Sequence, residues 1–205
     1  MLRRAMKAKQ TGFTLIELMV AIFVLAVLLG IGVPNFRDFI RNSRITGATN
    51  DLITDFNLAR SEAVKRRVPV TLCKSQNGTT CDADATAAFT RWIVFVDDAN
   101  PAAAAAADGN GAVDTGEQVL RRREVHPSIQ VRSNANGRLK VYQSNGFPNN
   151  AIAGSVNLFV LCDERKNVTT VGGDSAARAV TIETTGRATA TRNKATITNL
   201  GGCPL

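Results

Sequence analysis

The hydrophobic pattern of the chain begins with one long apolar run. From Phe13 to Val33 the residues are apolar almost throughout, and Glu17 is their only charged residue. About 20 such residues are enough for a helix to cross a lipid bilayer. A charged side chain costs roughly 2.5–3.5 kcal/mol near the centre of a membrane helix, and Glu17 lies only one turn from the start of the run. The run therefore predicts a membrane-spanning helix, and Glu17 predicts a cationic partner at a similar depth.

A second, amphipathic helical pattern follows Pro34. Its apolar residues recur at intervals of three and four, which places them on one face of a helix: Ile45, Ala48, Leu52, Phe56, Ala59 and Ala63. We expect this helix to continue to Val64 or Lys65 and to lay its apolar face on a domain. Because proline removes a backbone donor and clashes with the preceding turn, we expect Pro34 to kink the helix or to unwind it locally.

The rest of the chain alternates short apolar segments with turn residues such as Asn136-Gly137 and Gly172-Gly173. Strands are expected at residues 68–74, 91–96, 118–122, 128–132, 138–143, 155–162, 177–184 and 194–198. The alanine-rich residues 102–107 are expected to form an exposed loop. The pattern predicts an α+β fold, in which a long N-terminal helix packs on a mostly antiparallel β-sheet or two-sheet sandwich.

Charge is distributed unevenly over a chain whose formal net charge is +8. Residues 1–67 hold 11 basic and 5 acidic groups, residues 68–118 hold 2 and 7, and residues 119–205 hold 12 and 5. An acidic segment beside a basic C-terminal half suggests an oriented electrostatic surface. The alternative interpretation is that these charges belong to solvated loops or to contacts between subunits.

Catalytic signatures are absent from the sequence. It contains no G-x-S-x-G, Walker A or H-E-x-x-H motif, and its single histidine, His126, precedes Pro127 with no nucleophile motif beside it. We therefore expect no enzymatic activity and no cofactor. Trp92 lies in an apolar strand and is expected in the core.

Four cysteines indicate disulfide bonds in an oxidising compartment such as the periplasm. They are Cys73, Cys81, Cys162 and Cys203. No C-x-x-C pair occurs, so a zinc site is not expected. Three pairings are possible. The favoured one joins Cys73 to Cys81 across a short turn and Cys162 to Cys203, which would tie the C-terminal tail to a strand.

Oxygen-bearing side chains gather between two of the predicted strands. They are of the types that bind Ca²⁺: Asp97, Asp98, Asp108, Asn110, Asp114 and Glu117. Their spacing is not that of an EF-hand loop, and the alanine run interrupts it. Aspartate and asparagine next to glycine are also what tight turns require. The favoured interpretation is a set of turns, and no metal site is predicted.

A family resemblance is carried by the N-terminus. A basic leader, Gly12, the run Phe-Thr-Leu-Ile-Glu from Phe13 to Glu17 and an apolar helix together resemble the class III signal of type IV pilins and type II secretion pseudopilins. The resemblance implies cleavage after Gly12 by a prepilin peptidase and N-methylation of Phe13. It also implies that Glu17 pairs with the terminal amine of a neighbouring subunit in the filament, and the helices of such pilins often bend at a proline in the place of Pro34.

The implied organisation has four parts. Residues 1–12 form the leader, residues 13–34 the transmembrane helix, residues 35–67 its amphipathic continuation and residues 68–205 a periplasmic β-rich domain. The expected location is the bacterial inner membrane, crossed once with the C-terminal domain in the periplasm, followed by incorporation into a filament. The implied partners are prepilin peptidase, the inner membrane and other major or minor pilins or pseudopilins.

A second resemblance covers the region after the membrane helix. Several short motifs are similar to the GspH/FimT branch of pseudopilins and FimU-like minor pilins: Ala59 to Val64, Trp92 to Asp98, Asp108 to Gly111, Gly116-Glu117, Val119 to Arg121 and Thr185-Gly186-Arg187. The branch implies a helix packed on β-sheets. It also implies a minor pilin or pseudopilin that assembles into, and primes, a type IV pilus or a type II secretion pseudopilus.

An alternative function remains open at this point, a receptor for double-stranded DNA in natural transformation. In FimT-like minor pilins a C-terminal Gly-Arg-x-Arg motif is associated with DNA binding. Here Gly186-Arg187 is present, but Thr189 stands at the second arginine position. The candidate contacts to the phosphate backbone are Arg187, Arg192, Lys194 and Arg178.

Overall fold

The computed structural model describes residues 12–84, 88–98, 109–133, 139–151, 155–170, 172–199 and 203. The chain forms two compact units, residues 1–40 and residues 41–205. Helix α1 (Leu15–Arg66) contributes its first part to one unit and its second part to the other. Each unit is described by itself below.

In the first unit α1 begins with a capped N-terminus. Thr14 Oγ1 accepts a hydrogen bond from the Glu17 backbone N–H at 3.3 Å, and Thr14 O accepts one from Leu18 N. Threonine before the helix with glutamate three residues later is the arrangement of a capping box, and an acidic side chain is favoured near the positive end of the helix dipole. The helix is continuous through Pro34, so the local unwinding considered for that residue does not occur.

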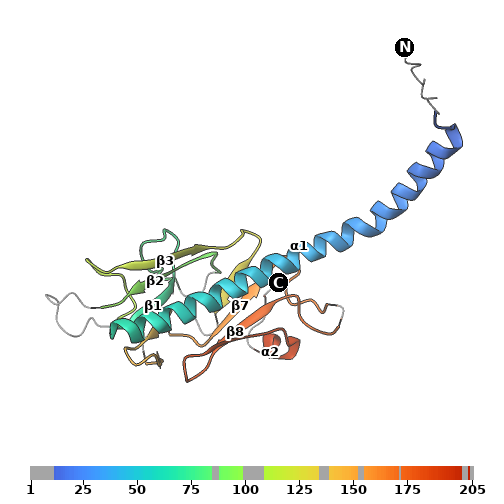
Figure 1. Cartoon of the computed structure of the whole chain (residues 1–205). Coiled ribbons are helices and arrows are strands. Elements are labelled where there is room, and N and C mark those ends of the chain that lie inside the picture. The colour runs from blue at the N-terminus through green and yellow to red at the C-terminus, as the bar shows by residue number, and fades with distance from the viewer. Residues whose placement is uncertain are drawn as a thin grey trace, which may run out of the picture. The chain divides into compact units, whose positions relative to one another are not determined.

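In the second unit α1 buries the predicted apolar stripe. Its six members are all at most 5% exposed, which confirms the helical spacing: Ile45, Ala48, Leu52, Phe56, Ala59 and Ala63. The helix ends at Arg66, close to the expected end, and Arg67 follows with a positive φ of 60°. In Figure 1 this part of α1 runs across the strands of the same unit.

Two antiparallel sheets make up the β-domain. The first has the strand order β3-β2-β1-β5-β6, with β1 (Val70–Lys74), β2 (Arg91–Val96), β3 (Val119–Glu124), β5 (Leu139–Tyr142) and β6 (Pro148–Asn149). The second has the order β4-β7-β8-β9, with β4 (Gln130–Ser133), β7 (Leu158–Cys162), β8 (Arg178–Ile182) and β9 (Ala188–Thr191). The expected α+β fold, a long helix on antiparallel sheets, is therefore correct.

Both sheets contribute one face to the core that covers α1. Val70 and Val94 enter it from the first sheet, and Phe159 enters it from the second, where its ring centroid lies 5.2 Å from that of Phe56. Alternate residues along a strand point to opposite faces. The neighbouring residues Leu158 and Val160 therefore form a smaller cluster on the other face of the second sheet.

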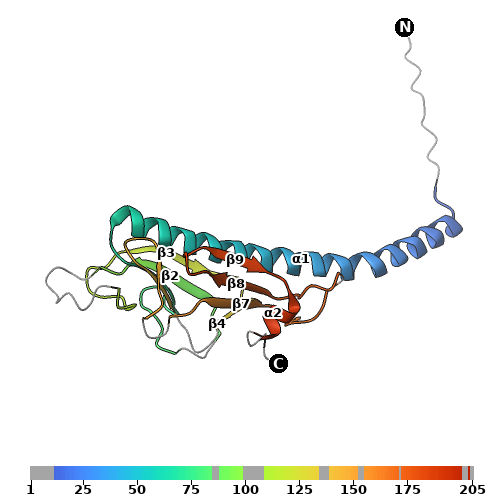
Figure 2. The same cartoon turned by 90° about the horizontal axis from the view of Figure 1, so that it is seen from below.

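That second face is covered by helix α2 (Lys194–Asn199), whose Ile197 is fully buried among Leu158, Val160 and Ala179. Figure 2 shows α2 below β7 and β8, with α1 above them. The prediction of a strand at residues 194–198 was wrong. Asn193 caps this helix, because its Oδ1 accepts the Thr196 N–H at 3.0 Å and its carbonyl accepts Ile197 N.

The other strand predictions overlap β1, β2, β3, β4, β5, β7 and β8. Two strands were not predicted. β6 has only two residues, and β9 is rich in alanine, which is a weak strand former. The pairing of β9 with β8 places Val180 opposite Ala190, so the hairpin is held by its partner strand rather than by its own propensity.

Candidate functional site

The N-terminal part of α1 exposes its apolar side chains on all sides. No side chain from Phe13 to Val33 is buried, and Phe13 itself is 83% exposed. The structure contains one described helix that is long and apolar enough to span a membrane, and its apolar window belongs to this part of the chain. Gly12 has no non-neighbouring atom within 4 Å of an added Cβ, so the backbone at the expected cleavage point is open.

Glu17 lies in the first turn of this helix, and its side chain is exposed. Its backbone N–H bonds to Thr14, as described above, and no ion pair to its carboxylate occurs among the described residues. The local structure thus places the Glu17 carboxylate near the chain position where cleavage after Gly12 would create a new amino terminus. The role of the pair remains a prediction.

Arg187 lies at the tip of the β8–β9 hairpin. Gly186 N donates to Glu183 O at 2.8 Å, and Glu183 N donates to Arg187 O at 2.9 Å, which closes the turn. Gly186 has a φ of +82°, and a Cβ at this position would lie 2.8 Å from Gly146 O. Only glycine meets both demands without strain. The Thr185-Gly186-Arg187 motif therefore has a structural reason that is independent of any ligand.

The remaining cationic candidates lie at the other end of β9. Arg192 follows the strand and forms a 3.6 Å ion pair with Asp174, while Lys194 Nζ donates to Thr169 Oγ1. Arg187 and Arg192 are five residues apart on an extended segment, a separation of about 16 Å. The hairpin arginine and the other candidates therefore do not form one compact patch.

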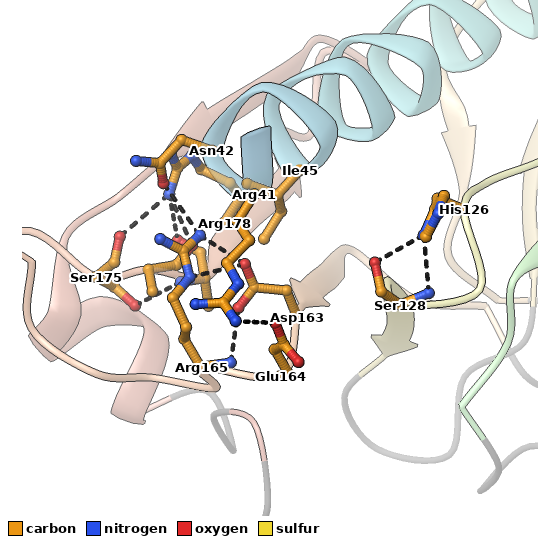
Figure 3. Close-up of polar contacts among 12 residues, drawn as sticks. Arg41, Asn42, Ile45, His126, Ser128, Asp163, Glu164, Arg165, Ser175 and Arg178 are labelled. Carbon is orange, nitrogen blue, oxygen red and sulfur yellow. Dashed lines mark hydrogen bonds and ion pairs between the residues drawn. The ribbon is translucent and has the colours of Figure 1, made fainter. Parts of the chain in front are cut away.

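Arg178 is buried, with 6% of its surface exposed. Figure 3 shows it beneath the start of the second part of α1, near Asn42 and Ser175. Its Nη1 donates to the carbonyl oxygens of Ser175, Ala176 and Ala177 at 2.9–3.1 Å. Burial lowers the pKa of the Arg178 guanidinium below its ordinary value. This side chain organises the loop before β8 and is not presented to a nucleic acid.

A network of ion pairs surrounds Arg178. Arg165 bonds to Asp163 at 2.5 Å and to Asn42 Oδ1 at 3.0 Å, and Arg41 pairs with Glu164 at 2.6 Å. Figure 3 shows these contacts joining the helix to the turn after β7. The basic residues here are therefore largely engaged within the domain. That engagement disfavours the DNA-receptor interpretation of the sequence.

The four cysteines form two disulfide bonds in the structure, Cys73–Cys81 and Cys162–Cys203. This is the pairing that the sequence favoured. The second bond joins the segment after α2 to the end of β7, and Cys203 packs with the cluster that includes Ile197. The C-terminal helix is thus held on its sheet both by apolar contacts and by a covalent link.

His126 occupies an exposed turn, also visible in Figure 3. Its Nδ1 lies 2.8 Å from Ser128 Oγ and accepts the Ser128 backbone N–H at 3.2 Å. A histidine that accepts a backbone N–H two residues away is a local turn contact.

Several charged side chains are buried although the sequence did not indicate it, among them Asp55 and Lys140. Asp55 on α1 is fully buried and accepts hydrogen bonds from Trp92 Nε1 at 2.9 Å and from Arg123 Nε at 3.1 Å. Lys140 in β5 is also fully buried, and its Nζ lies 2.5 Å from the Oδ1 atoms of both Asn150 and Asn157. Burial lowers the pKa of Lys140 to about 8. In the sequence, only the apolar stripe around Asp55 could have indicated that this residue lies near the buried face of the helix.

The acidic segment folds into turns over the end of β2. Asp97 is fully buried, and its Oδ2 accepts hydrogen bonds from Thr71 Oγ1 at 2.5 Å and from Gly111 N at 2.9 Å. Glu117 Oε2 accepts the Asp114 N–H at 2.7 Å. Asp108 and the alanine run lie outside the described residues. Among the residues that the structure describes, no three His, Cys, Asp or Glu side chains are grouped to hold a metal ion.

Comparisons with known proteins agree with these features. Residues 48–198 match the family described as type II transport protein GspH, and residues 7–33 match the prokaryotic N-terminal methylation motif. Prepilin peptidase-dependent protein D of Escherichia coli (strain K12) is 40% identical over 76 residues, which are 36% of this chain and 44% of that protein. The matched segment is thus less than half of the relative's length.

Crystal structures of the type IV minor pilin FimU of Pseudomonas aeruginosa (strain PAO1) are also similar. One crystal form has 15% sequence identity and a TM-score of 0.47 over 75% of this chain and 92% of FimU. A second form has 14% identity and a TM-score of 0.44 over 71% and 91%. The family match rests on residues 48–198, which include the second part of α1 and both sheets. The chain therefore belongs to the GspH family of pilin-like proteins and carries an N-terminal methylation motif.

Proposed function

We propose that the protein is a minor pilin or pseudopilin whose activity is assembly. Prepilin peptidase cuts the chain after Gly12, and Phe13 becomes the methylated amino terminus. The mature protein is then held in the inner membrane before assembly. It then enters a type IV pilus or a type II secretion pseudopilus, where it primes the filament together with other pilins. Supporting observations are the methylation motif over residues 7–33 and the family match over residues 48–198.

The observation that carries this proposal is the uncovered apolar helix. From Phe13 to Val33 every side chain is exposed, on all faces. In water each large apolar side chain left uncovered forgoes about 1.5–3 kcal/mol of burial. The segment therefore requires lipid or other helices as its surroundings. The membrane supplies lipid before assembly, and a filament of packed helices supplies other helices afterwards.

Glu17 gives this packing its register. In a medium of low dielectric constant an unpaired carboxylate is costly, and a cation at the same depth removes much of that cost. Processing at Gly12 creates such a cation four residues before Glu17 in the sequence. A neighbouring helix that is displaced along the filament axis brings its own Phe13 amine to the Glu17 carboxylate. Only one displacement aligns the two groups, so the pair selects the subunit stagger.

The test replaces Glu17 in the native host. Glu17→Val should leave membrane insertion intact and lower the amount of protein in sheared filaments about tenfold or more, because an unpaired buried charge costs several kcal/mol. Quantitative immunoblots of membrane and filament fractions measure this ratio. Glu17→Asp retains the charge and should recover part of the incorporation. Glu62→Gln removes a carboxylate from the second part of α1 and serves as the matched control.

Mass spectrometry of the mature protein provides the second measurement. The expected N-terminal peptide begins at Phe13 and carries one methyl group. Normal incorporation of Glu17→Val would contradict the register, whereas an intact precursor that begins at Met1 would contradict the whole assignment. The two results are thus separable.

A further inference from the structure

Strand β9 is one edge of the four-stranded sheet, and its own residues do little to hinder the addition of a further strand. Figure 2 shows it at the end of the row β4, β7, β8 and β9. Its residues are Ala188, Thr189, Ala190 and Thr191, all of them small and uncharged, and Ala190 is exposed. Natural proteins commonly protect an open edge with charged side chains, proline or a bulge. β9 contains none of these, and its pairing with β8 runs without a register shift.

The register of the β8–β9 hairpin determines which backbone groups of β9 point outward. Glu183 N donates to Arg187 O at 2.9 Å, so these two residues form a hydrogen-bonded pair. Hydrogen-bonded and non-hydrogen-bonded pairs alternate along an antiparallel ladder. Ala188 and Ala190 therefore occupy non-hydrogen-bonded positions opposite β8. It follows that their N–H and C=O groups point away from β8, toward the open side of the sheet.

Two further hydrogen bonds agree with this direction. Ile182 is the partner of Ala188 in the register, and its N–H donates to Asn157 O, just before β7, at 2.7 Å. The N–H of Ile182 is thus directed away from β9, as a non-hydrogen-bonded pair requires. Beyond the strand, Arg192 O accepts the Ser175 N–H at 2.8 Å, which closes the edge at that point. The open stretch of the edge is therefore β9 itself.

The charges that flank β9 indicate which kind of strand fits beside it. Arg192 follows β9 and pairs with Asp174 at 3.6 Å. Arg187 precedes β9, is exposed and forms no ion pair with another described residue. An antiparallel second copy of β9 would bring the Arg187 end of one molecule against the Arg192 end of the other, and a parallel copy would align the two Arg187 side chains. Because like charges brought together across an interface are costly, the edge suits a different strand with an acidic residue near Arg187.

We propose that β9 is a docking edge for an extended segment of a different pilin or pseudopilin subunit, which carries an acidic residue beside Arg187. The inference rests on the proposed function, because the filament supplies the neighbouring subunits. The added strand exchanges hydrogen bonds with the outward backbone groups of Ala188 and Ala190. In this mode of recognition the main chain provides affinity and the side chains provide specificity. The acid beside Arg187 then selects the partner and its direction.

Proline substitutions test the direction of the backbone groups. Ala190→Pro removes an outward N–H and leaves the hydrogen bonds to β8 in place, so the midpoint of thermal unfolding should fall by no more than about 2 °C. Thr189→Pro removes an N–H directed at β8 and should lower the midpoint by about 5 °C or more. Ala190→Val keeps the outward N–H and is the matched control. Thermal unfolding of the detergent-solubilised full chains measures these shifts, and equal falls for the two proline variants would contradict the register.

Incorporation in the native host tests the docking itself. Ala190→Pro should lower the ratio of filament protein to membrane protein about tenfold, because the partner strand loses a donor for one of its carbonyl groups. Ala190→Val should be incorporated as the wild type is. Arg187→Glu should lower the ratio about threefold, and Arg187→Lys, which keeps the charge, should lower it less. Quantitative immunoblots of membrane and sheared-filament fractions measure the four ratios.

Photo-crosslinking identifies the occupant of the edge. With p-benzoylphenylalanine in place of Thr189, irradiation of the native host should give an adduct with another pilin or pseudopilin subunit. Mass spectrometry of the adduct should locate the crosslink in an extended segment of that subunit that contains an aspartate or glutamate. Introducing Ala190→Pro should remove the adduct, whereas Ala190→Val should retain it.

The proposal is overturned if the Ala190→Pro and Arg187→Glu proteins enter filaments as the wild type does. It is also overturned if the adduct from position 189 is absent, or joins a second copy of this chain or DNA. Failure of the proposed function has a different signature, since the wild type itself would then be missing from the filament fraction. In that case this inference falls with it.

Discussion

The two parts of α1 place their apolar side chains in opposite surroundings. Phe56, in the second part, is fully buried against the sheets, whereas Phe23, in the first part, is 70% exposed. The same contrast holds for their acids: Asp55 is bonded by Trp92 and Arg123, while the Glu17 side chain is exposed. The second part thus completes its contacts within its own chain. The first part leaves its apolar side chains exposed, as the proposed assembly requires.

The largest expected effect tests this contrast with two phenylalanines. Phe56→Ala should lower the free energy of unfolding of the domain by about 3–5 kcal/mol, because it leaves a cavity beside Phe159. Phe23→Ala should leave that free energy unchanged within about 0.5 kcal/mol, as expected for an exposed side chain. Urea unfolding followed by the fluorescence of Trp92, the only tryptophan, measures both. Equal losses in the free energy of unfolding in the two variants would contradict the contrast between the two parts of α1.

Substitution of an acidic residue in the second part of α1 tests the same contrast, with a slightly smaller expected loss in the free energy of unfolding. Asp55→Ala should cost about 3 kcal/mol or more, because it leaves the indole N–H and the Arg123 guanidinium without their buried acceptor. The emission of Trp92 should also shift, since its hydrogen bond is lost. Asp51→Ala is the matched control, because Asp51 is 43% exposed and pairs with the same Arg123 at 3.3 Å. Its loss should cost less than about 1 kcal/mol.

Glycine substitutions give the smallest expected effect. Gly186→Ala should lower the free energy of unfolding by about 1–3 kcal/mol, because the residue has a positive φ and its Cβ would press on Gly146 O. Gly47→Ala, at an exposed helical position with nothing within 4 Å, should raise it by about 0.8–1 kcal/mol. Thermal unfolding of the two variants, measured side by side with the wild type, gives both changes in stability. A stabilised Gly186→Ala protein would show that the turn is not strained by a side chain.

Patterns within one element could be predicted from the sequence. The stripe from Ile45 to Ala63 follows the helical period, and the apolar run at residues 91–96 matches β2 because buried strands are continuous in hydrophobicity. The cleavage motif before Phe13 is similarly local. These signals need no knowledge of what lies nearby in space.

Features that depend on distant partners could not be predicted. Arg178 was assigned to a surface, yet the start of the second part of α1 and the loop before β8 bury it. Residues 194–198 contain β-branched residues that favour a strand, but the Asn193 cap and the apolar cluster around Ile197 favour a helix. Asp55 meets Arg123 across 68 positions of sequence, and no local pattern records such a pairing.

Strand β3 forms one edge of the five-stranded sheet and bears three consecutive arginines, Arg121, Arg122 and Arg123. A sheet edge can act as a template for a strand of another molecule, which is a common start of aggregation. Long charged side chains along an edge strand hinder pairing with the identical edge of a second copy. Crowded copies are thereby discouraged from joining sheet to sheet. Under the proposed function, association between copies is then left to the apolar first part of α1.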